Sequence, residues 1–275
     1  MKNIPLLFSV GITLAAISFL GFKNFGEAKT QKMDISAKQK LRVMTYNIHH
    51  ANPPSKEGII DLEAIIETIK AEDPDLVALQ EVDVNTQRSG KGNQAQLIGD
   101  ALGMHVFFGK AINFEKGEYG VAILSKFPIL DSKIYSLPTV AETNGEPRIL
   151  ATIDIELPDG RTVRFGSTHL DAQKADTNRL LQIQKIVEIA EKVEMPFVVA
   201  GDLNAAPGSA VIDILDKSLK RTCENCPSTI PAKAPEKAID FIAFRSDSEI
   251  LVMEHRVIEQ AYASDHLPVL AVLGI

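Results

Sequence analysis

From Leu41 to the end of the chain, short apolar runs alternate with segments of helical periodicity. Short runs of this kind are typical of β-strands. We expect strands at Leu41–Tyr46, Leu76–Leu79, Val121–Leu124, Ile149–Ile155, Thr162–Thr168, Phe197–Ala200, Ile239–Phe244, Ile250–Val257 and Leu267–Leu273. The sequence LPDG at Leu157–Gly160 predicts a hairpin turn between two of these strands.

Two other segments carry apolar residues at helical spacing. The first follows a possible N-cap at Asp61, and the second lies further along the chain. Their apolar stripes are Leu62, Ile65, Ile66 and Ile69, and then Leu180, Ile183, Val187 and Ala190. No internal repeat or second linker interrupts the pattern. We therefore predict one α/β domain over residues 41–275, with two mixed sheets packed face to face and helices outside.

The N-terminal segment is expected to lie outside this domain. Lys2 precedes the apolar stretch Ile4–Phe22, and a small-x-small cleavage site ends at Ala28. Residues 1–28 are predicted to be a signal peptide or, since the stretch approaches membrane-spanning length, a retained membrane anchor. Residues 29–40 are polar and are predicted to be a linker. Both alternatives predict an exported domain, in the periplasm, at the cell surface or in the medium.

Charge and cysteine content bear on partners and compartment. The formal net charge of −7 disfavours bulk nucleic acid as a partner, because non-specific binding to it depends on Lys and Arg. The two cysteines, Cys223 and Cys226, are expected to form a local disulfide in an exported chain. A zinc site would need further ligands of similar kind, and no second cysteine pair exists.

Polar and ionisable side chains lie at the ends of the predicted strands. They are Asn47, Glu81, His169, Asp202, Asn204, Asp240, Asp265 and His266. Each alone is explained as a turn or cap residue. Together at one edge of a sandwich they would form a cluster rich in oxygen ligands and without thiols. Such a cluster favours Mg²⁺, Mn²⁺ or Ca²⁺ and, with histidines nearby, metal-assisted attack of water on phosphorus.

A series of short motifs appears in a fixed order along the chain. They are MTYNIH, LQEVD, YGVAILSKFPI, EPRI, STHLD, GDLNAAP, IDFI and SDHLPV. In this order they resemble the endonuclease/exonuclease/phosphatase superfamily of DNase I-like metal-dependent hydrolases, from about Leu41 to Ile275. The resemblance implies a four-layer α/β sandwich, in agreement with the predicted strands.

The resemblance also implies a metal site. Glu81 matches the principal metal ligand, Asn47 lies beside it, and Asp265 supports the water shell of the ion. The implied cofactor is Mg²⁺, with Mn²⁺ as an alternative, and the number of ions stays open.

The catalytic roles follow from the same motifs. Asp202 matches the aspartate that orients or deprotonates the attacking water, and Asn204 the neighbour that positions the phosphate. His266, held by Asp240, matches the histidine that faces the phosphate, and His169 matches a second histidine. Two further residues, Tyr119 and Arg148, are expected to bind substrate. Whether Asp202 or His266 is the base stays open.

The motifs indicate that a phosphoester bond is hydrolysed, but they do not identify the substrate. We expect a phosphodiester or phosphomonoester, and we favour a small or lipid-borne substrate over duplex DNA because the chain has no Trp and no basic arm. A secreted nuclease and a non-catalytic binding module are the alternatives. We expect a monomer that contacts a membrane only through an uncleaved N-terminal segment. His49 and His50 are expected to be exposed in a loop, although they follow Asn47 closely.

Overall fold

The computed structural model describes residues 1–2 and 38–275. Apart from residues 1–2 and 38–40, the predicted signal peptide or anchor (1–28) and the predicted linker (29–40) lie outside the described residues. Within the described part of the chain, no helix combines the length and the apolar character that a bilayer span requires.

The domain contains two sheets of six strands each. The first has the order β11-β12-β1-β2-β4-β3, and the second has the order β5-β6-β7-β8-β10-β9. The strands of the first sheet are β1 (Lys40–Asn47), β2 (Leu76–Val84), β3 (His105–Phe114), β4 (Gly117–Ser125), β11 (Leu251–Val257) and β12 (Val269–Gly274). Those of the second are β5 (Ile129–Leu137), β6 (Arg148–Glu156), β7 (Thr162–His169), β8 (Phe197–Asp202), β9 (Leu219–Arg221) and β10 (Asp240–Arg245). Both sheets are mixed, because β1 pairs with β2, and β7 with β8, in parallel, whereas the other pairs are antiparallel.

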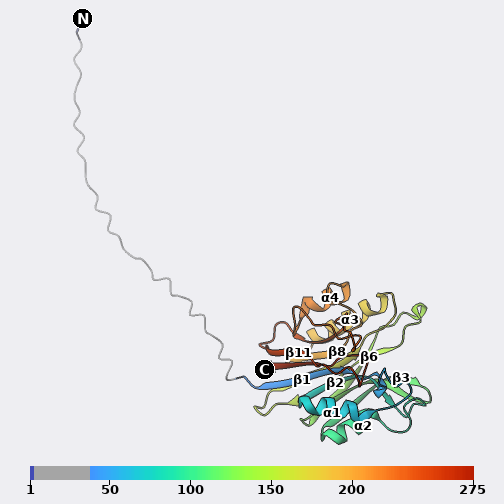
Figure 1. The fold of residues 1–275 in the computed structure, drawn as a ribbon. Helices are drawn as coiled ribbons and strands as arrows, with labels where there is room; N and C mark the ends of the chain where they lie inside the picture. Colours follow the sequence, from blue (N-terminus) through green and yellow to red (C-terminus); the bar gives the residue numbers. More distant parts are fainter. Residues whose placement is uncertain (3–37) are drawn as a thin grey trace. The chain divides into compact units, whose positions relative to one another are not determined.

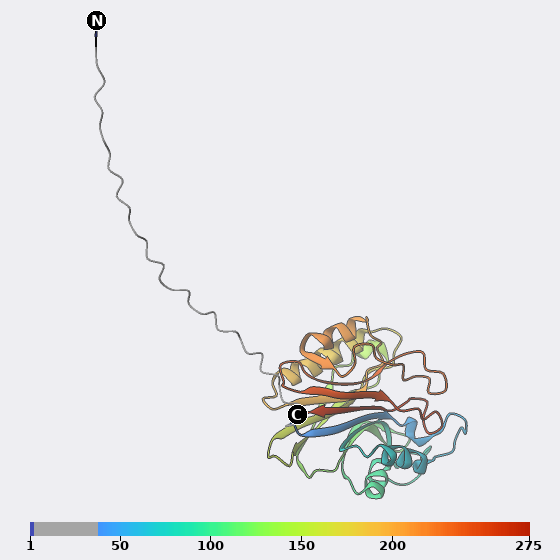
Figure 2. The same ribbon diagram turned by 60° about the vertical axis from the view of Figure 1, so that its left-hand side comes forward.

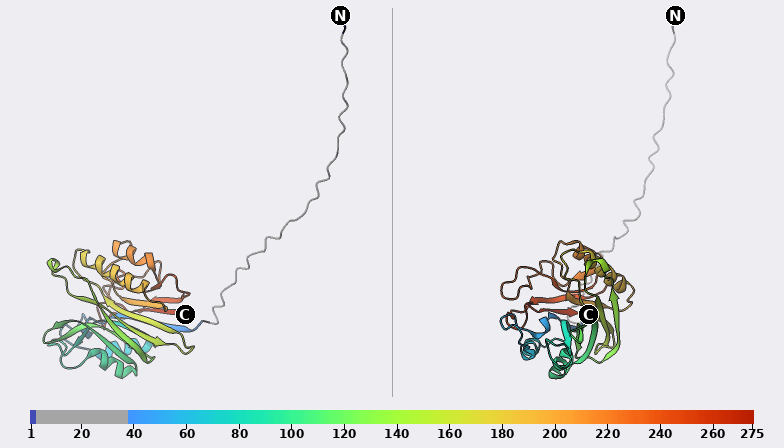
Figure 3. Two further views of the ribbon diagram at one scale, coloured as in Figure 1. Left: turned by 180° about the vertical axis from the view of Figure 1, so that it is seen from behind. Right: turned by 90° about the vertical axis from the view of Figure 1, so that its right-hand side faces the viewer.

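Helices cover the outer face of each sheet (Figure 1). The helices α1 (Leu62–Glu72) and α2 (Gln94–Leu102) share an apolar cluster with the first sheet, and α3 (Thr177–Glu191) and α4 (Ala210–Ser218) share one with the second. A third cluster fills the space between the sheets, with Phe165 and Phe244 among its residues. The turned views in Figures 2 and 3 show the same succession of layers. The predicted four-layer α/β sandwich is confirmed.

Local interactions explain where the predicted elements begin. The Asp61 side chain accepts a hydrogen bond from the backbone N–H of Ala64, as expected of the N-cap of α1. In the LPDG turn the Gly160 N–H donates to the Leu157 carbonyl at 2.8 Å, and Gly160 has a φ of 84°, which a residue without Cβ adopts readily. The last strand begins at Val269 and not at the predicted Leu267. The Leu267 N–H donates instead to the carbonyl of Thr229, outside the sheet.

Several elements were not predicted. They are β3, β5, β9, α2 and α4. The β5 strand is an edge strand whose residues are mostly exposed, so it lacks the apolar run that marks a buried strand. The β9 strand has three residues, too few to produce a pattern.

We predict that Phe165→Ala strongly destabilises the domain. Phe165 has no exposed surface and packs in the cluster between the sheets. Removing such a ring costs about 3–5 kcal/mol of unfolding free energy. Urea unfolding should show this loss, whereas Leu130→Ala, at a side chain that is 58% exposed on β5, should change stability by less than about 0.5 kcal/mol. Equal effects of the two substitutions would contradict the assignment of the central core.

Candidate active site

Strand register aligns three ionisable side chains across the second sheet. His169 ends β7 and pairs with Asp202 at the end of parallel strand β8. Asp202 pairs in turn with Asp240, the first residue of antiparallel strand β10. Paired residues project from the same face of a sheet, so the three side chains form one row. Each is buried, with at most 4% of its surface exposed.

The first sheet contributes Asn47 and Glu81. Asn47 ends β1, which lies parallel to β2. The pairing of β2 with β4 is interrupted by a bulge between Leu79 and Val82, and Glu81 within it has a φ of 58°. A bulge re-aims a side chain that strict alternation would place on the other face. It thereby brings the Glu81 carboxylate to the edge at which β1 ends.

A layer of buried polar side chains separates these residues from the apolar core between the sheets. Thr45 Oγ1 donates to Gln80 Oε1 at 3.2 Å, and Gln80 Nε2 donates to Ser167 Oγ of the second sheet at 3.3 Å. The three side chains are completely buried. They satisfy one another's hydrogen bonds, which offsets the cost of burying them beside charged groups.

The Asn47 amide links the two halves of the cluster. Its Nδ2 donates to Glu81 Oε1 and to Asp202 Oδ2, both at 3.1 Å. Its Oδ1 accepts from the backbone N–H of His49 at 3.1 Å, which orients the amide. The Asn204 N–H donates to Asp202 Oδ1 at 2.8 Å. Both oxygens of the Asp202 carboxylate are therefore held.

The loop before β12 supplies Asp265 and His266. His266 Nδ1 lies 2.9 Å from Asp240 Oδ2, and its Nε2 lies 3.7 Å from Asp202 Oδ2. Thr229 Oγ1 donates to the same Asp240 oxygen at 2.5 Å. The loop is joined to β1 because Ser264 Oγ donates to the Asn47 carbonyl at 2.7 Å.

The charges of this network differ from those of free side chains. Burial and the nearby Asp240 raise the pKa of Asp202 to about 7. Burial alone would lower the pKa of His266, but Asp240 and Asp202 together raise it to about 10. At neutral pH His266 is therefore an imidazolium, and Asp202 binds a proton more readily than a free aspartate does.

His169 lies on the other side of Asp202 and, unlike His266, is neutral. Its Nε2 is 3.5 Å from Asp202 Oδ2, and Arg148 Nη1 lies 3.2 Å from its Nδ1. A guanidinium can only donate, so Nδ1 accepts and carries no proton. Burial and Arg148 accordingly hold the pKa of His169 well below its ordinary value. Arg148 also pairs with Glu146 at 3.0 Å.

Tyr119 borders the cluster and a neighbouring pocket. Burial and the Glu81 charge raise the pKa of its hydroxyl, which stays protonated. The pocket is lined by Tyr119, Arg88, Ile112, Phe114 and Glu146. The Arg88 side chain is fixed there by two hydrogen bonds to Asp83 and lies 4.6 Å from the centre of the Phe114 ring.

The donor set fits a hard divalent cation. Among the described residues, no Lys or Arg forms an ion pair with Glu81, Asp202, Asp240 or Asp265; the basic side chains beside Glu81, Asp202 and Asp240 are histidines. A group of carboxylates without Lys or Arg partners and with an adjacent amide is the type of site that binds Mg²⁺ or Mn²⁺. Ser264 connects Asp265 to Asn47, because its Oγ bonds to the Asn47 carbonyl and lies 3.4 Å from Asp265 Oδ1.

The structure brings the candidate site residues to one edge of the sandwich, and it corrects one expectation. His49 and His50 are half-buried, not exposed in a loop, and His50 Nδ1 lies 3.9 Å from Glu81 Oε2. Sequence reasoning also missed Thr229 and Ser264. Ser264 is the first residue of the SDHLPV motif, whereas Thr229 lies in an irregular segment with no recognisable pattern.

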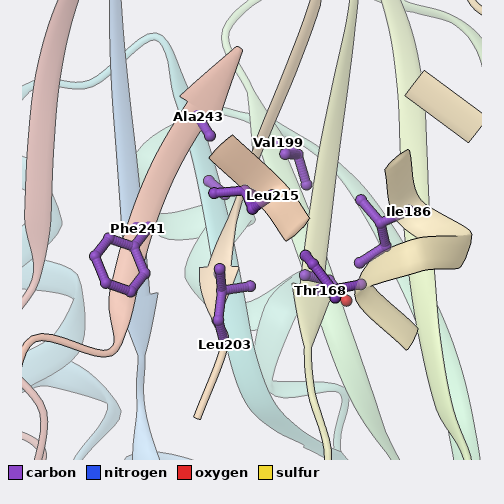
Figure 4. A pocket seen from close by; sticks show the side chains of 10 residues that line it. Thr168, Ile186, Val199, Leu203, Leu215, Phe241 and Ala243 are labelled. Carbon is purple, nitrogen blue, oxygen red and sulfur yellow. The ribbon is translucent and has the colours of Figure 1, made fainter. Parts of the chain in front are cut away.

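A small cavity between the second sheet and the helices that cover it is not part of this site. Figure 4 shows its lining, which is apolar apart from Thr168 and includes Ile186, Leu215 and Phe241. These residues belong to β7, α3, α4 and β10, so the cavity lies within the packing between the second sheet and its helices.

Comparison with known proteins gives a family match. Residues 44–266 match the Endonuclease/Exonuclease/phosphatase family. The chain is 28% identical over 203 residues to an inositol phosphosphingolipids phospholipase C from Schizosaccharomyces pombe. This match covers 66% of this chain and 45% of the relative. The chain thus spans less than half the length of this relative.

Solved structures share the fold. An endonuclease/exonuclease/phosphatase from Beutenbergia cavernae has a TM-score of 0.75 at 24% identity, covering 86% of this chain and 72% of its own. A mannosyl-6-phosphatase from Bacteroides thetaiotaomicron has a TM-score of 0.70 at 21% identity, covering 86% and 100%. At these identities the likeness concerns the fold alone.

We predict that Asp240→Asn lowers the pKa of His266. The substitution removes the carboxylate that both hydrogen-bonds the imidazolium and attracts its charge. Because the pKa of His266 in the folded protein lies above 6.5, its protonated form contributes stability below pH 6.5 that is lost as the pH rises through about 10. This contribution should shrink in the variant.

Imidazole NMR titration of the metal-free protein measures this pKa directly. His255, whose Nδ1 bonds to Thr222 Oγ1 away from the cluster, serves as the internal control. A His266 that titrates at the same pH in both proteins would contradict the assigned pair.

Proposed function

The chain belongs to the endonuclease/exonuclease/phosphatase family, and we propose that it hydrolyses a phosphoester by attack of water at phosphorus. The observation that carries the proposal is the buried Asp202 carboxylate, which lies between a neutral and a cationic imidazole. A binding module would gain nothing from burying these groups together at a cost in stability.

Asp202 is the group best suited to activate the water. A general base works best when its pKa is near the working pH, and the pKa of Asp202 is about 7. His266 already carries its proton at that pH, because its pKa is about 10. In the proposed step Asp202 takes a proton from water, the water oxygen bonds to phosphorus, and the bond from phosphorus to the leaving oxygen breaks.

His266 and Arg148 supply positive charge. The transferring phosphoryl group spreads negative charge over its oxygens, and cationic donors at fixed positions stabilise it. Asp240 orients His266 and keeps it charged, and Thr229 in turn holds Asp240. In this proposal Asn204 keeps the Asp202 carboxylate in place and contacts the phosphate.

Glu81, Asn47 and Asp265 are the residues that would hold Mg²⁺, or Mn²⁺ in its place. The ion would supply Lewis-acid stabilisation of the phosphoryl oxygens. The contribution of the chain is the placement of Glu81 by the β2 bulge and of the Asn47 amide between the two carboxylates.

We propose a small or lipid-borne phosphoester as the substrate. The relative from Schizosaccharomyces pombe is named an inositol phosphosphingolipids phospholipase C, and the solved structure from Bacteroides thetaiotaomicron is named a mannosyl-6-phosphatase. The pocket beside Tyr119 also supports this substrate class, because Phe114, Ile112 and the fixed Arg88 offer apolar and cationic contacts to a non-reacting group. DNA and RNA are the alternative substrates, to be decided by assay.

We also propose that the domain is exported. Cys223 and Cys226 form a disulfide, as the sequence predicts, and disulfides persist in oxidising compartments. Protein recovered from the periplasm, cell surface or medium should have an N-terminus near Lys29. N-terminal sequencing checks this, and an intact Met1 would favour the retained membrane anchor.

We predict that the purified protein hydrolyses a phosphoester in the presence of Mg²⁺. The substrates to assay are sphingomyelin-type and inositol phosphodiesters, sugar phosphates, DNA and RNA. On the best substrate, Asp202→Asn should lower kcat by about 10²–10⁴-fold, because it keeps the shape of the side chain but removes the base. Chelation should abolish activity, and Mg²⁺ or Mn²⁺ should restore it.

Asp154→Asn is a matched control for the same chemical change. Asp154 is also buried, but it lies on β6 and forms an ion pair with Arg164 of β7. Arg164 precedes His169 by five residues, which places it about 16 Å from His169 along the strand. Asp154→Asn should retain near wild-type kcat. If folded Asp202→Asn also retained it, or if no phosphoester were hydrolysed, the proposed function would be wrong.

A further inference from the structure

Two imidazoles lie beside Glu81, at the outer end of the cluster. One ligand atom from each of His49, His50 and Glu81 lies within 4.8 Å of the other two. The His49 and His50 rings are 4.6 Å apart, centre to centre. The proposed hydrolysis uses neither histidine.

The two rings are held in ways that suit metal ligation. His49 Nδ1 lies 2.8 Å from the Asn52 carbonyl and must donate to it, which leaves Nε2 free with its lone pair. A metal-bound histidine commonly has its second nitrogen fixed in this way. His50 Nδ1 is buried and has no hydrogen-bond partner among the described residues, and its 3.9 Å distance from Glu81 Oε2 is too long for a hydrogen bond.

The backbone that carries the rings is strained and locked. His49, His50 and Ala51 have φ values of 47°, 42° and 58°, in the left-handed region that side chains with a Cβ seldom occupy in succession. Gln94 Nε2 donates to the His50 carbonyl at 2.7 Å, and Asn47 Oδ1 accepts from the His49 N–H. Strain that is maintained by surrounding bonds is concentrated at functional sites.

We propose that His49, His50 and Glu81 bind a transition-metal dication such as Zn²⁺. Imidazole nitrogen suits such ions better than Mg²⁺, which prefers oxygen ligands alone. Three protein ligands leave further coordination positions for water or a substrate oxygen. The site shares Glu81 with the proposed phosphoesterase centre but requires no turnover to be detected.

Zn²⁺ titration of the metal-free full chain by calorimetry, with the bound metal measured after dialysis, tests this assignment. His49→Gly and His50→Gly remove one imidazole each, and glycine tolerates the left-handed backbone. Each should weaken Zn²⁺ binding by at least about 10-fold and leave Mg²⁺ binding near the wild-type value. Thermal melting confirms that the variants are folded.

Two controls separate ligation from general effects. His105→Ala removes an exposed imidazole, and Asp73→Gly places glycine at another left-handed position, where φ is 47°, at the end of α1. Both should bind Zn²⁺ as the wild type does. His266→Ala tests the second cluster of potential ligands, formed by Asp202, Asp240 and His266.

Three outcomes would overturn the assignment. They are a wild-type protein that binds no Zn²⁺, unchanged binding in both glycine variants, and binding lost in His266→Ala but kept in His50→Gly. None of them concerns hydrolysis, which is judged separately by the Asp202→Asn variant.

Discussion

The two hydrogen bonds donated by the Asn47 amide connect the proposed metal ligand, Glu81, to the proposed general base, Asp202. One goes to Glu81 on the first sheet, and the other goes to Asp202 on the second. A neutral amide between two carboxylates lets them approach without a salt bridge. The group proposed to hold the metal is thereby fixed relative to the group proposed to activate water. The packing of the two sheets sets this distance, so the apolar core between them determines the geometry of the site.

The site is costly for the fold. Asp202 and Asp240 are buried neighbours of like charge, and the protein accommodates them by charging His266 and by raising the pKa of Asp202. The layer of Thr45, Gln80 and Ser167 separates these charges from the apolar core. The left-handed backbone at Glu81 and at His49 to Ala51 adds local strain. The buried like charges and the left-handed backbone each lower stability, and each is explained by the chemistry proposed for this edge of the sandwich.

Much of this arrangement could be predicted from the sequence, because strand ends and hydrophobic runs are local signals. Asp202 and His169 follow apolar strands directly, so their convergence at one edge could be expected. The exposed strand β5 and the short strand β9 leave no such signal. Thr229 reaches Asp240 from an irregular segment, which only tertiary packing can reveal. The position of His50 depends on a left-handed turn at residues without glycine, so an exposed loop was the natural but incorrect expectation.

The proposed hydrolysis requires Asp202 to be a buried carboxylate that accepts a proton near neutral pH. Carboxyl ¹³C NMR of the metal-free protein tests it most directly, with the Asp202→Asn spectrum assigning the signal. We expect a titration midpoint near pH 7. A midpoint near 3.8, the ordinary value for aspartate, would contradict it.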